Sequence, residues 1–390
     1  MTLLLERPFR TYWVFNEFAY FSVWMNTVAI GWSMTQMSAS TFMVASVQAA
    51  ASLPVAFAAL PAGILADRWE RRRFLFWVNA WMTAVGAAMV ITYAIGAVTP
   101  AILLVFAALM AVGMGANFPA SQAMSADIVE PPKIMEAAAL NTLGSNLARS
   151  FGPPAGAAIL TIAGPIAVFA YGMLSRAALG IMYWFWPASE SRLVGFDDRK
   201  QPPMSFGGIL KQQAFIPTLS VTFLLFLSGS AFWALLPVYA NTTMPGESAN
   251  LLGWCMGSTG LGAVVATGFL KRLRMRMSDG WVAFFLCIAC ALGLAGLTKG
   301  TGFLQALGAC GLFGIGWGAM VAILNGKTQS IFSSQVRARA ISLNILAMYV
   351  GMGLGSLIVG VLADQFGISS SLLSASSLLV ALALISAFVL

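Results

Sequence analysis

The sequence predicts an all-α integral membrane protein with twelve transmembrane helices in two pseudo-symmetric halves of six. Three observations lead to this fold class. First, of the 390 residues, 59% are hydrophobic and only 9% are charged, and the mean hydropathy is +0.85, which indicates a chain embedded in lipid. Second, the apolar stretches match the roughly 20 residues that a helix needs to cross a bilayer. Third, one extended polar stretch interrupts them near the middle of the chain.

Twelve apolar stretches account for the expected helices, with ends defined to within several residues. In chain order they run from Tyr12 to Gln36, Phe42 to Ala66, Phe74 to Gly96, Ala101 to Ser125, Met135 to Ile162, Ile166 to Pro187, Phe215 to Tyr239, Leu251 to Leu270, Trp281 to Leu297, Phe303 to Leu324, Ala340 to Leu362 and Leu372 to Leu390. The first is much longer than the apolar region of a secretory signal peptide, and no convincing cleavage site follows it. We therefore expect it to remain in the mature protein.

Two residue types limit the chemistry of the chain. There is no histidine, which excludes imidazole proton relays and histidine-ligated metals, so proton chemistry would use carboxylates. The cysteines all fall in apolar stretches and are expected as buried thiols; they are Cys255, Cys287, Cys290 and Cys310. Because a paired acidic metal motif and a nucleophile arrangement are also missing, we expect no enzymatic activity, no metal and no cofactor.

The distribution of positive charge predicts the orientation in the membrane. With the amino terminus in the cytoplasm, the Lys and Arg residues outside the apolar spans lie in cytoplasmic loops, with the exception of Lys299. This is the positive-inside pattern, and it predicts a bacterial inner-membrane protein with both termini in the cytoplasm. The net charge of +8 is therefore a topology signal with weak attraction to anionic lipid, and we expect no nucleic-acid binding.

The longest polar stretch, residues 188–213, divides the chain into an N-terminal half, residues 1–187, and a C-terminal half, residues 214–390. Shifting the first half by 203 positions aligns Gly113 with Gly316, Gly115 with Gly318, Ala137 with Ala340, Leu140-Asn141 with Leu343-Asn344, and Gly152 with Gly355. These matches indicate a duplicated unit. Because each unit has an even number of spans, the halves would be related by an axis along the membrane normal.

The loop between the second and third spans carries the most informative motif, Gly63 to Arg73, with the sequence GILADRWERRR. A second motif, Gly152-Pro153-x-x-Gly156, lies in the fifth span. On these residues nearly the whole chain resembles the major facilitator superfamily, specifically its drug and siderophore exporter branch. The loop is similar to the superfamily signature, with Glu70 where many members have glycine, and the second motif is similar to one associated with antiporters. Further similarities to the branch are Asp127-Ile128-Val129 with Pro131, Leu140-Asn141, and Asn146-Leu147-Ala148-Arg149.

One departure from this resemblance concerns proton coupling. The arginine that proton-coupled drug exporters often carry in helix four falls here at Leu109, four residues before Gly113. That element of their coupling machinery is therefore missing.

Asp67 has an expected role that follows from its position. It ends the second helix on the cytoplasmic side, where the eleventh helix of a two-fold assembly begins near Ala340, and a carboxylate against a helix amino terminus is stabilised by about 0.3–1 kcal/mol. We expect the loop to latch the two halves when the cytoplasmic side is closed, through Gly63, Asp67, Arg68, Arg71 and Arg72. The alternative is a solvated helix end that only sets topology, and positive-inside retention explains the arginines equally well.

The glycine-proline motif of the fifth span has two interpretations. Gly152, Pro153 and Gly156 allow close helix approach and a bend, a packing feature that many membrane proteins share. The resemblance implies instead an antiporter-like role for the same residues. The sequence leaves both open.

Ionisable groups in the hydrocarbon region cost several kcal/mol unless they are paired or hydrated. Three lie there: Glu17 about two turns into the first helix, Arg149 near the middle of the fifth and Arg176 near the middle of the sixth. The resemblance implies that helices one, four, seven and ten line a central cavity, and that two, five, eight and eleven line the seam between the halves. We therefore expect Glu17 to face water and bind the coupling proton.

Arg149 is expected close enough to Glu17 to pair with it. It would either stabilise the charged form of Glu17 or contact an anionic group on the substrate, so that substrate and proton displace each other. The alternative is a purely structural ion pair between the first and fifth helices. Asp127 is a second proton candidate, although its position at the cytoplasmic end of the fourth helix favours a helix-end or latch role. Arg176 receives no role from the sequence.

The substrate cavity is predicted to be aromatic and amide-lined rather than charged. Aromatic and Met surfaces suit bulky, partly apolar ligands, although such residues also pack helices or face lipid in any membrane bundle. The candidates are Phe21, Trp24 and Asn26 in the first helix, Asn117 in the fourth, Trp233 in the seventh and Asn325 in the tenth.

Together these features predict a secondary active transporter that works by alternating access as a monomer. It would export amphipathic or aromatic small molecules, of drug or siderophore type, in exchange for protons. A lipid or lysolipid translocator or an uncoupled facilitator is the alternative, favoured slightly by Leu109. A membrane receptor or scaffold would explain the hydrophobicity but not the duplicated glycine-rich helices.

Overall fold

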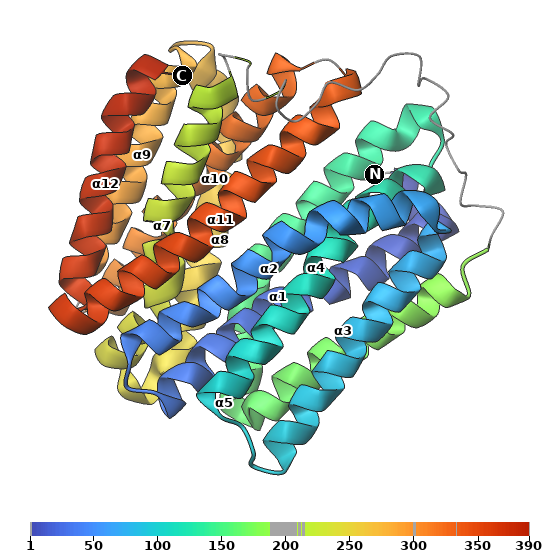
Figure 1. The fold of residues 1–390 in the computed structure, drawn as a ribbon, viewed down its shortest axis with the longest axis horizontal. Coiled ribbons are helices and arrows are strands. Elements are labelled where there is room, and N and C mark those ends of the chain that lie inside the picture. Colours follow the sequence, from blue (N-terminus) through green and yellow to red (C-terminus); the bar gives the residue numbers. More distant parts are fainter. Residues whose placement is uncertain are drawn as a thin grey trace.

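The structure, a computed structural model, is a bundle of long helices, and no strand occurs in its described part. It describes residues 2–187, 209, 212, 215–298, 302–332 and 334–389, while the side chains of residues 2, 59–68 and 334–338 lie outside the description. Most of the predicted linker, residues 188–213, also lies outside it. Two adjoining groups of helices make up the bundle, an N-terminal group of α1–α5 and a C-terminal group of α7–α12 (Figure 1).

The N-terminal group contains the five long helices labelled α1 to α5. They are α1 (Arg7–Met37), α2 (Thr41–Arg68), α3 (Arg71–Ala94), α4 (Pro100–Ile128) and α5 (Ile134–Trp184), with short 3₁₀ turns η1 (Thr2–Leu5) and η2 (Pro131–Lys133). Within α5 the backbone breaks at Gly164, which has φ 75° and ψ 177° and precedes Pro165. Glycine adopts this conformation without steric cost and proline ends the preceding helix. The break falls where the sequence separates the fifth and sixth predicted spans.

The C-terminal group follows after residue 214. It comprises α7 (Phe215–Thr243), η4 (Pro245–Glu247), α8 (Ser248–Arg274), α9 (Asp279–Thr298), α10 (Phe303–Ile331), α11 (Ser334–Phe366) and α12 (Ile368–Val389). A sharp turn joins α11 to α12 at Gly367, whose φ is 83°. The four cysteines of this group are buried and free, as the sequence predicts.

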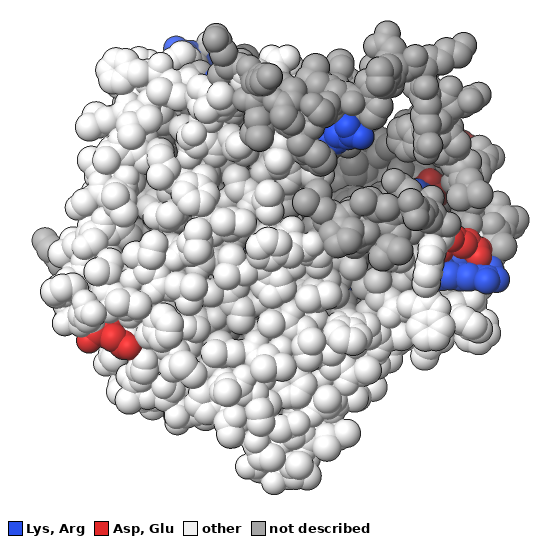
Figure 2. All heavy atoms as spheres, viewed as in Figure 1, with Lys and Arg blue, Asp and Glu red and all other residues white. Residues whose placement is uncertain are grey.

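Ten helices of the described part are long and apolar enough to cross a membrane. The two parts of α5 count as one among these ten, and α1 is not among them. Polar residues of α1, including Glu17 and Asn26, interrupt its apolar character. On the face in Figure 2 the described charged side chains lie near the periphery, and a broad uncharged belt separates them. An all-helical, multi-pass membrane protein follows from these observations.

Two seams join the groups, α2 against α11 and α5 against α8, and these are the four helices that the resemblance implies at the seam. On the α5/α8 seam a Cβ at Gly253 would lie 2.8 Å from the Pro153 carbonyl oxygen. On the other side of α5, a Cβ at Gly156 would lie 2.7 Å from Met25 Cα of α1. The glycine-proline motif therefore packs α5 tightly between α1 and α8, because neither contact has space for a side chain.

Hydrogen bonds join the two groups at the end of the bundle where α1 ends and α2 begins. Trp32 Nε1 donates to Ser248 Oγ over 3.1 Å, and Gln36 Nε2 donates to Asn241 Oδ1 over 3.1 Å. Nearby, Asp364 of α11 accepts from Ser40 Oγ over 2.8 Å and from the backbone N–H of Thr41 over 2.6 Å. The groups are therefore closed against each other at this end.

Candidate transport site

Glu17 lies on α1 and only 8% of it is exposed. Both carboxyl oxygens are buried and have no hydrogen-bond partner within the described structure. The carboxyl group lies directly against Gly144 of α5, where any Cβ would overlap it. A buried carboxylate without a partner costs several kcal/mol, and proton uptake removes that charge. This geometry makes Glu17 suited to hold a proton where α1 meets α5.

The predicted ion pair between Glu17 and Arg149 does not form, which corrects the sequence-based expectation. Arg149 Cζ lies 5.6 Å from the centre of the Trp24 ring, within the range of a cation–π interaction. The reason is the position of Arg149 along α5. It lies five residues, about 7.5 Å, beyond Gly144, and only three before Gly152, where a Cβ would lie 2.9 Å from Trp24 Cβ. The guanidinium therefore reaches Trp24 rather than Glu17.

Aromatic side chains from both groups of helices gather beside Arg149. The rings of Trp24 and Trp233 lie 6.1 Å apart between α1 and α7, and Trp233 lies 6.4 Å from Trp317 of α10. Phe21, one turn before Trp24, is partly buried and packs against the same core. The structure thus brings Phe21, Trp24 and Trp233 to one region, in which α1, α7 and α10 supply an apolar wall.

Two of the predicted cavity amides are instead turned into the N-terminal group. Asn117 is buried, with 3% exposed, and its Oδ1 accepts a hydrogen bond of 3.1 Å from Asn79 of α3. The side chain of Asn26 lies against Gly172, whose Cβ would approach Asn26 Nδ2 to 2.6 Å. Each side chain packs against a neighbouring helix of its own group, so the structure does not support a cavity-lining role for either.

Asn325 of α10 belongs to a polar contact between helices of the C-terminal group. Its Oδ1 accepts a hydrogen bond of 3.1 Å from Asn344 of α11, and Asn344 in turn accepts one of 2.9 Å from Thr222 of α7. Asn325 is half-buried whereas Asn344 is 1% exposed. Asn325 therefore remains a candidate for the cavity, held in place by Asn344.

The signature loop forms ion pairs within the N-terminal group. Asp127, at the end of α4, pairs with Arg71 at the start of α3, and the Asp127 side chain is 7% exposed. This pair supports the role of Asp127 at the helix end, and its role as a second proton candidate stays a prediction. Gly63, Asp67 and Arg68 lie among residues 59–68, whose side chains are outside the described part.

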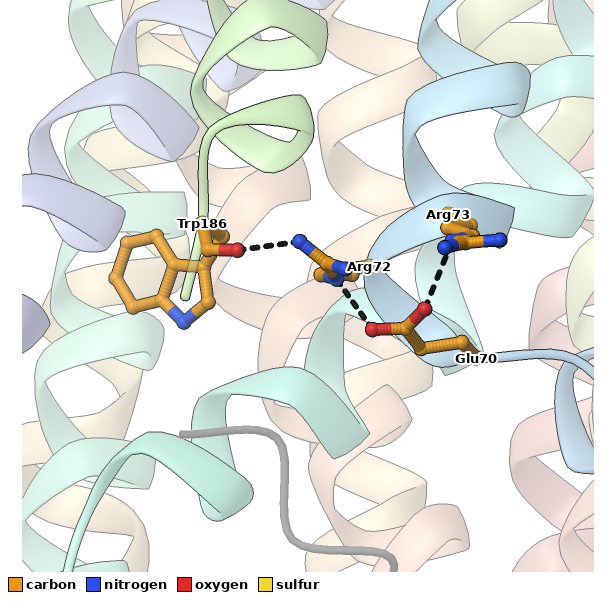
Figure 3. A network of polar contacts seen from close by, with 4 residues as sticks. All are labelled: Glu70, Arg72, Arg73 and Trp186. Carbon is orange, nitrogen blue, oxygen red and sulfur yellow. Dashed lines mark hydrogen bonds and ion pairs between the residues drawn. The ribbon is translucent and has the colours of Figure 1, made fainter. Parts of the chain in front are cut away.

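Glu70 joins two arginines of the same loop (Figure 3). Its carboxylate pairs with Arg72 and, over 2.9 Å, with Arg73. Arg72 also donates a hydrogen bond of 2.7 Å to the carbonyl oxygen of Trp186, just after α5. Arg72 therefore holds the start of α3 next to the end of α5, and Glu70, the residue that departs from the superfamily signature, pairs with this arginine.

Sequence reasoning left Arg176 unassigned and missed Tyr349. Arg176 is 2% exposed, and its Nη2 donates to the Ala19 carbonyl oxygen over 3.3 Å, so it links α5 to α1 inside the N-terminal group. Tyr349 of α11 interacts electrostatically with Arg149 across the two groups. A tyrosine within an apolar helix gives no sequence signal, and only the assembly of the groups brings it to Arg149.

The family assignment agrees with this architecture. In the described residues no three His, Cys, Asp or Glu side chains gather as a possible metal site. The sequence profile of the transmembrane secretion effector family matches residues 2–390. The chain belongs to this family of the major facilitator superfamily. The chain is therefore a membrane transporter rather than an enzyme.

Two relatives match most of the length of this chain. The staphyloferrin A transporter of Staphylococcus aureus (strain NCTC 8325 / PS 47) is 23% identical over 361 residues, 88% of this chain and 87% of the relative. YfiS of Bacillus subtilis (strain 168), an uncharacterised transporter of the major facilitator type, is 23% identical over 392 residues, 93% of this chain and 88% of the relative.

Solved transporter structures share the fold of this chain. A mutant of the nucleoside transporter NupG has a TM-score of 0.77 at 13% identity, covering 97% of this chain and 98% of NupG. A bacterial homologue of the human lysosomal transporter Spinster, in an inward-facing and occupied conformation, has a TM-score of 0.75 at 13% identity, covering 98% and 97%. At these identities the likeness concerns the fold alone.

Proposed function

We propose that this protein is a secondary active transporter that exports amphipathic or aromatic small molecules, of drug or siderophore type, in exchange for protons. The observation that carries the proposal is a buried acid, Glu17, and a cation, Arg149, on the two sides of the α1/α5 contact. Neither side chain forms a hydrogen bond or an ion pair with a described residue. The family and the staphyloferrin A transporter relative support a small-molecule substrate.

Coupling would arise from competition between proton and substrate. In the conformation described, Glu17 is proposed to hold the proton while Arg149 lies against Trp24. Release of the proton leaves a carboxylate that can accept a hydrogen bond from a donor group of the substrate. Proton uptake removes this acceptor, so the proton displaces the substrate. A purely structural ion pair between Glu17 and Arg149 is disfavoured, because such a pair would be formed in this conformation and Arg149 lies over Trp24 instead.

The proposed architecture is twelve transmembrane helices in two six-helix halves, residues 1–187 and 214–390, joined by residues 188–213. Ten described helices are long and apolar enough to cross a membrane. Counting α1 as a further span, and the two parts of α5 as separate spans, gives twelve. Glycines 203 positions apart contact corresponding helices, which supports duplication. Gly113 of α4 contacts Met82 of α3, and its counterpart Gly316 of α10 contacts Leu286 of α9. Likewise, Gly152 of α5 contacts α1, and its counterpart Gly355 of α11 contacts α7.

We place the protein in the bacterial inner membrane as a monomer with both termini in the cytoplasm, following its positive loops. The end joined by Gln36 and Asn241 would then face outward, and the conformation would be closed to the outside. The latch role of Asp67 stays a prediction, supported by the packing of α2 against α11.

A lipid or lysolipid translocator, or an uncoupled facilitator, is the second candidate. An apolar groove of about 310 Å³ opens between α3 and α4 and is lined by Trp69, Phe74, Trp77, Val78, Trp81, Val112, Gly113 and Ala116. Leu109, which stands where the coupling arginine is expected, accepts a hydrogen bond from Trp81 Nε1 through its carbonyl oxygen over 3.1 Å. A groove that meets lipid at this position is the feature that favours this candidate.

Substrate-dependent proton movement in proteoliposomes under an imposed pH gradient tests the proposal. Siderophores and hydrophobic cations are screened, with Glu17→Gln beside the wild type. Proton exchange for a compound by the wild type but not by the variant supports antiport through Glu17. Equal substrate movement by both overturns it and favours the second candidate, which labelled lysolipid then tests directly.

A further inference from the structure

Arg149 lies where four helices from both groups meet. Trp24 of α1 lies beneath its guanidinium. On α8 a Cβ at Gly260 would lie 2.9 Å from the Arg149 carbonyl carbon, and Tyr349 of α11 interacts with Arg149 electrostatically. A site between the two groups is accessible to whichever side is open, which is the position that alternating access requires.

The hydrogen-bonding capacity of Arg149 is unused. A guanidinium has five N–H donors and no acceptor, yet Arg149 donates to no residue in the described part of the chain. Its Nε is buried without a partner, whereas the residue as a whole is half-buried. Tyr349 is half-buried, and its hydroxyl likewise donates to no described residue. The two side chains therefore present free donors from opposite groups of helices.

The charges around Arg149 leave it uncompensated. The described acids of the C-terminal group, Glu247, Asp279 and Asp364, lie at or next to helix ends. Arg176 is enclosed within the N-terminal group, at 2% exposure. Glu17 lies against Gly144, more than one helical turn from Arg149 along α5, and forms no ion pair with it. The guanidinium therefore has no carboxylate partner within the described structure.

We infer that the substrate carries an anionic group, a carboxylate by preference, that binds between the Arg149 guanidinium and the Tyr349 hydroxyl, while its apolar part packs against Trp24 and Trp233. This inference rests on the proposed function and names its substrate class. A planar guanidinium matches a carboxylate with two parallel hydrogen bonds. A hydrophobic cation meets an unpaired arginine there and is rejected.

Binding of three compounds with one aromatic body tests the charge preference. The probes are 2-naphthoate, neutral 2-naphthalenemethanol and cationic 2-naphthylmethylammonium, titrated calorimetrically into the full chain in detergent, with protein-free micelles as the blank. We expect the wild type to bind naphthoate at least about tenfold more tightly than the alcohol, which is about 1.4 kcal/mol, and to bind the cation most weakly. Equal affinities, a preference for the cation, or no measurable naphthoate binding overturn the inference.

Variants then assign the preference to the two donors. Arg149→Gln is expected to abolish the preference for naphthoate over the alcohol, and Arg149→Lys is expected to retain part of this preference. Tyr349→Phe is expected to weaken naphthoate binding by several-fold without changing binding of the alcohol. The control is Arg276→Gln, at an exposed arginine after α8. It removes the same charge as Arg149→Gln but far from the site, and it should leave the preference for naphthoate intact. Monodispersity in gel filtration verifies that each variant is folded, and an Arg149→Gln protein that keeps the preference overturns the inference.

The two experiments distinguish failure of this inference from failure of the proposed function. Charge-selective naphthoate binding without proton exchange in proteoliposomes leaves the substrate class standing and removes antiport. Proton-coupled transport restricted to hydrophobic cations keeps antiport and overturns the anionic substrate.

Discussion

The carboxyl group of Glu17 lies against the backbone of Gly144, at a point where α1 and α5 approach too closely for any side chain on α5. Gly144 also begins a series of small residues at four-residue spacing, followed by Ala148, Gly152 and Gly156. Such a series lets helices pack at short distance in lipid. The proposed proton site is therefore built into the packing of α1 on α5, and its geometry depends on the absence of a Cβ.

Gly144→Ala is expected to reduce proton-coupled transport about tenfold or more. Its methyl group overlaps the position of the Glu17 carboxyl, so the carboxyl must move, and overpacking of this kind costs about 1–3 kcal/mol. Transport in proteoliposomes and thermal unfolding in detergent measure the two effects. The matched control is Gly308→Ala on α10, where a Cβ meets nothing within 4 Å and transport should be unchanged. Wild-type transport by Gly144→Ala contradicts the assigned geometry.

The ion pairs of the signature loop should differ in their effect on stability. In Asp127→Asn, Arg71 loses its partner at a site where the Asp127 side chain is 7% exposed, and losing a charged hydrogen bond of this kind costs about 1.5–3 kcal/mol. Glu70→Gln breaks pairs in which the Glu70 side chain is 30% exposed, and exposed pairs contribute at most about 1 kcal/mol.

Thermal unfolding of both variants in the same detergent measures this difference. The melting temperature should fall further for Asp127→Asn than for Glu70→Gln. The reverse order contradicts the argument from burial.

The resemblance implied which helices form the seams, whereas the sequence itself predicted the apolar spans, because these depend on composition and spacing. The predicted boundary between the fifth and sixth spans, after Ile162 and before Ile166, contains the break of α5 at Gly164. The glycines of the motif in α5 were expected at close contacts, and they are there. Each of these features is a property of one segment, which a sequence displays directly.

The rotation of each helix about its axis was not predictable. Glu17 and Arg149 were assigned to the correct helices, but pairing depends on their relative height along α1 and α5, which differs by more than one helical turn. Asn117 was assigned to the cavity because of its type, whereas its face of α4 packs on Asn79. Residues that acquire a role only when the two groups assemble, such as Tyr349, carry no signal in the sequence.

Asn117→Ala is expected to lower stability and leave substrate preference unchanged. The variant removes the acceptor for Asn79 in a fully buried position, and a buried donor without a partner costs about 1–3 kcal/mol. Thermal unfolding and the relative transport rates of two substrates test this. Asn325→Ala is the comparison, because Asn325 is half-buried and remains a candidate for the cavity. A changed preference in Asn117→Ala would return that residue to the binding site.

A cross-link at the closed end should stop transport. Gln36 and Asn241 join α1 to α7 through a hydrogen bond of 3.1 Å, and alternating access requires this contact to open in each cycle. In the double variant Gln36→Cys and Asn241→Cys, a short bismaleimide should join the two helices and abolish transport in proteoliposomes. The native cysteines are buried and free, so they should react far more slowly than the introduced pair. Each single variant treated with the same reagent is the control and should keep its transport rate. If the cross-linked protein transports as fast as the untreated one, this end does not open during the cycle.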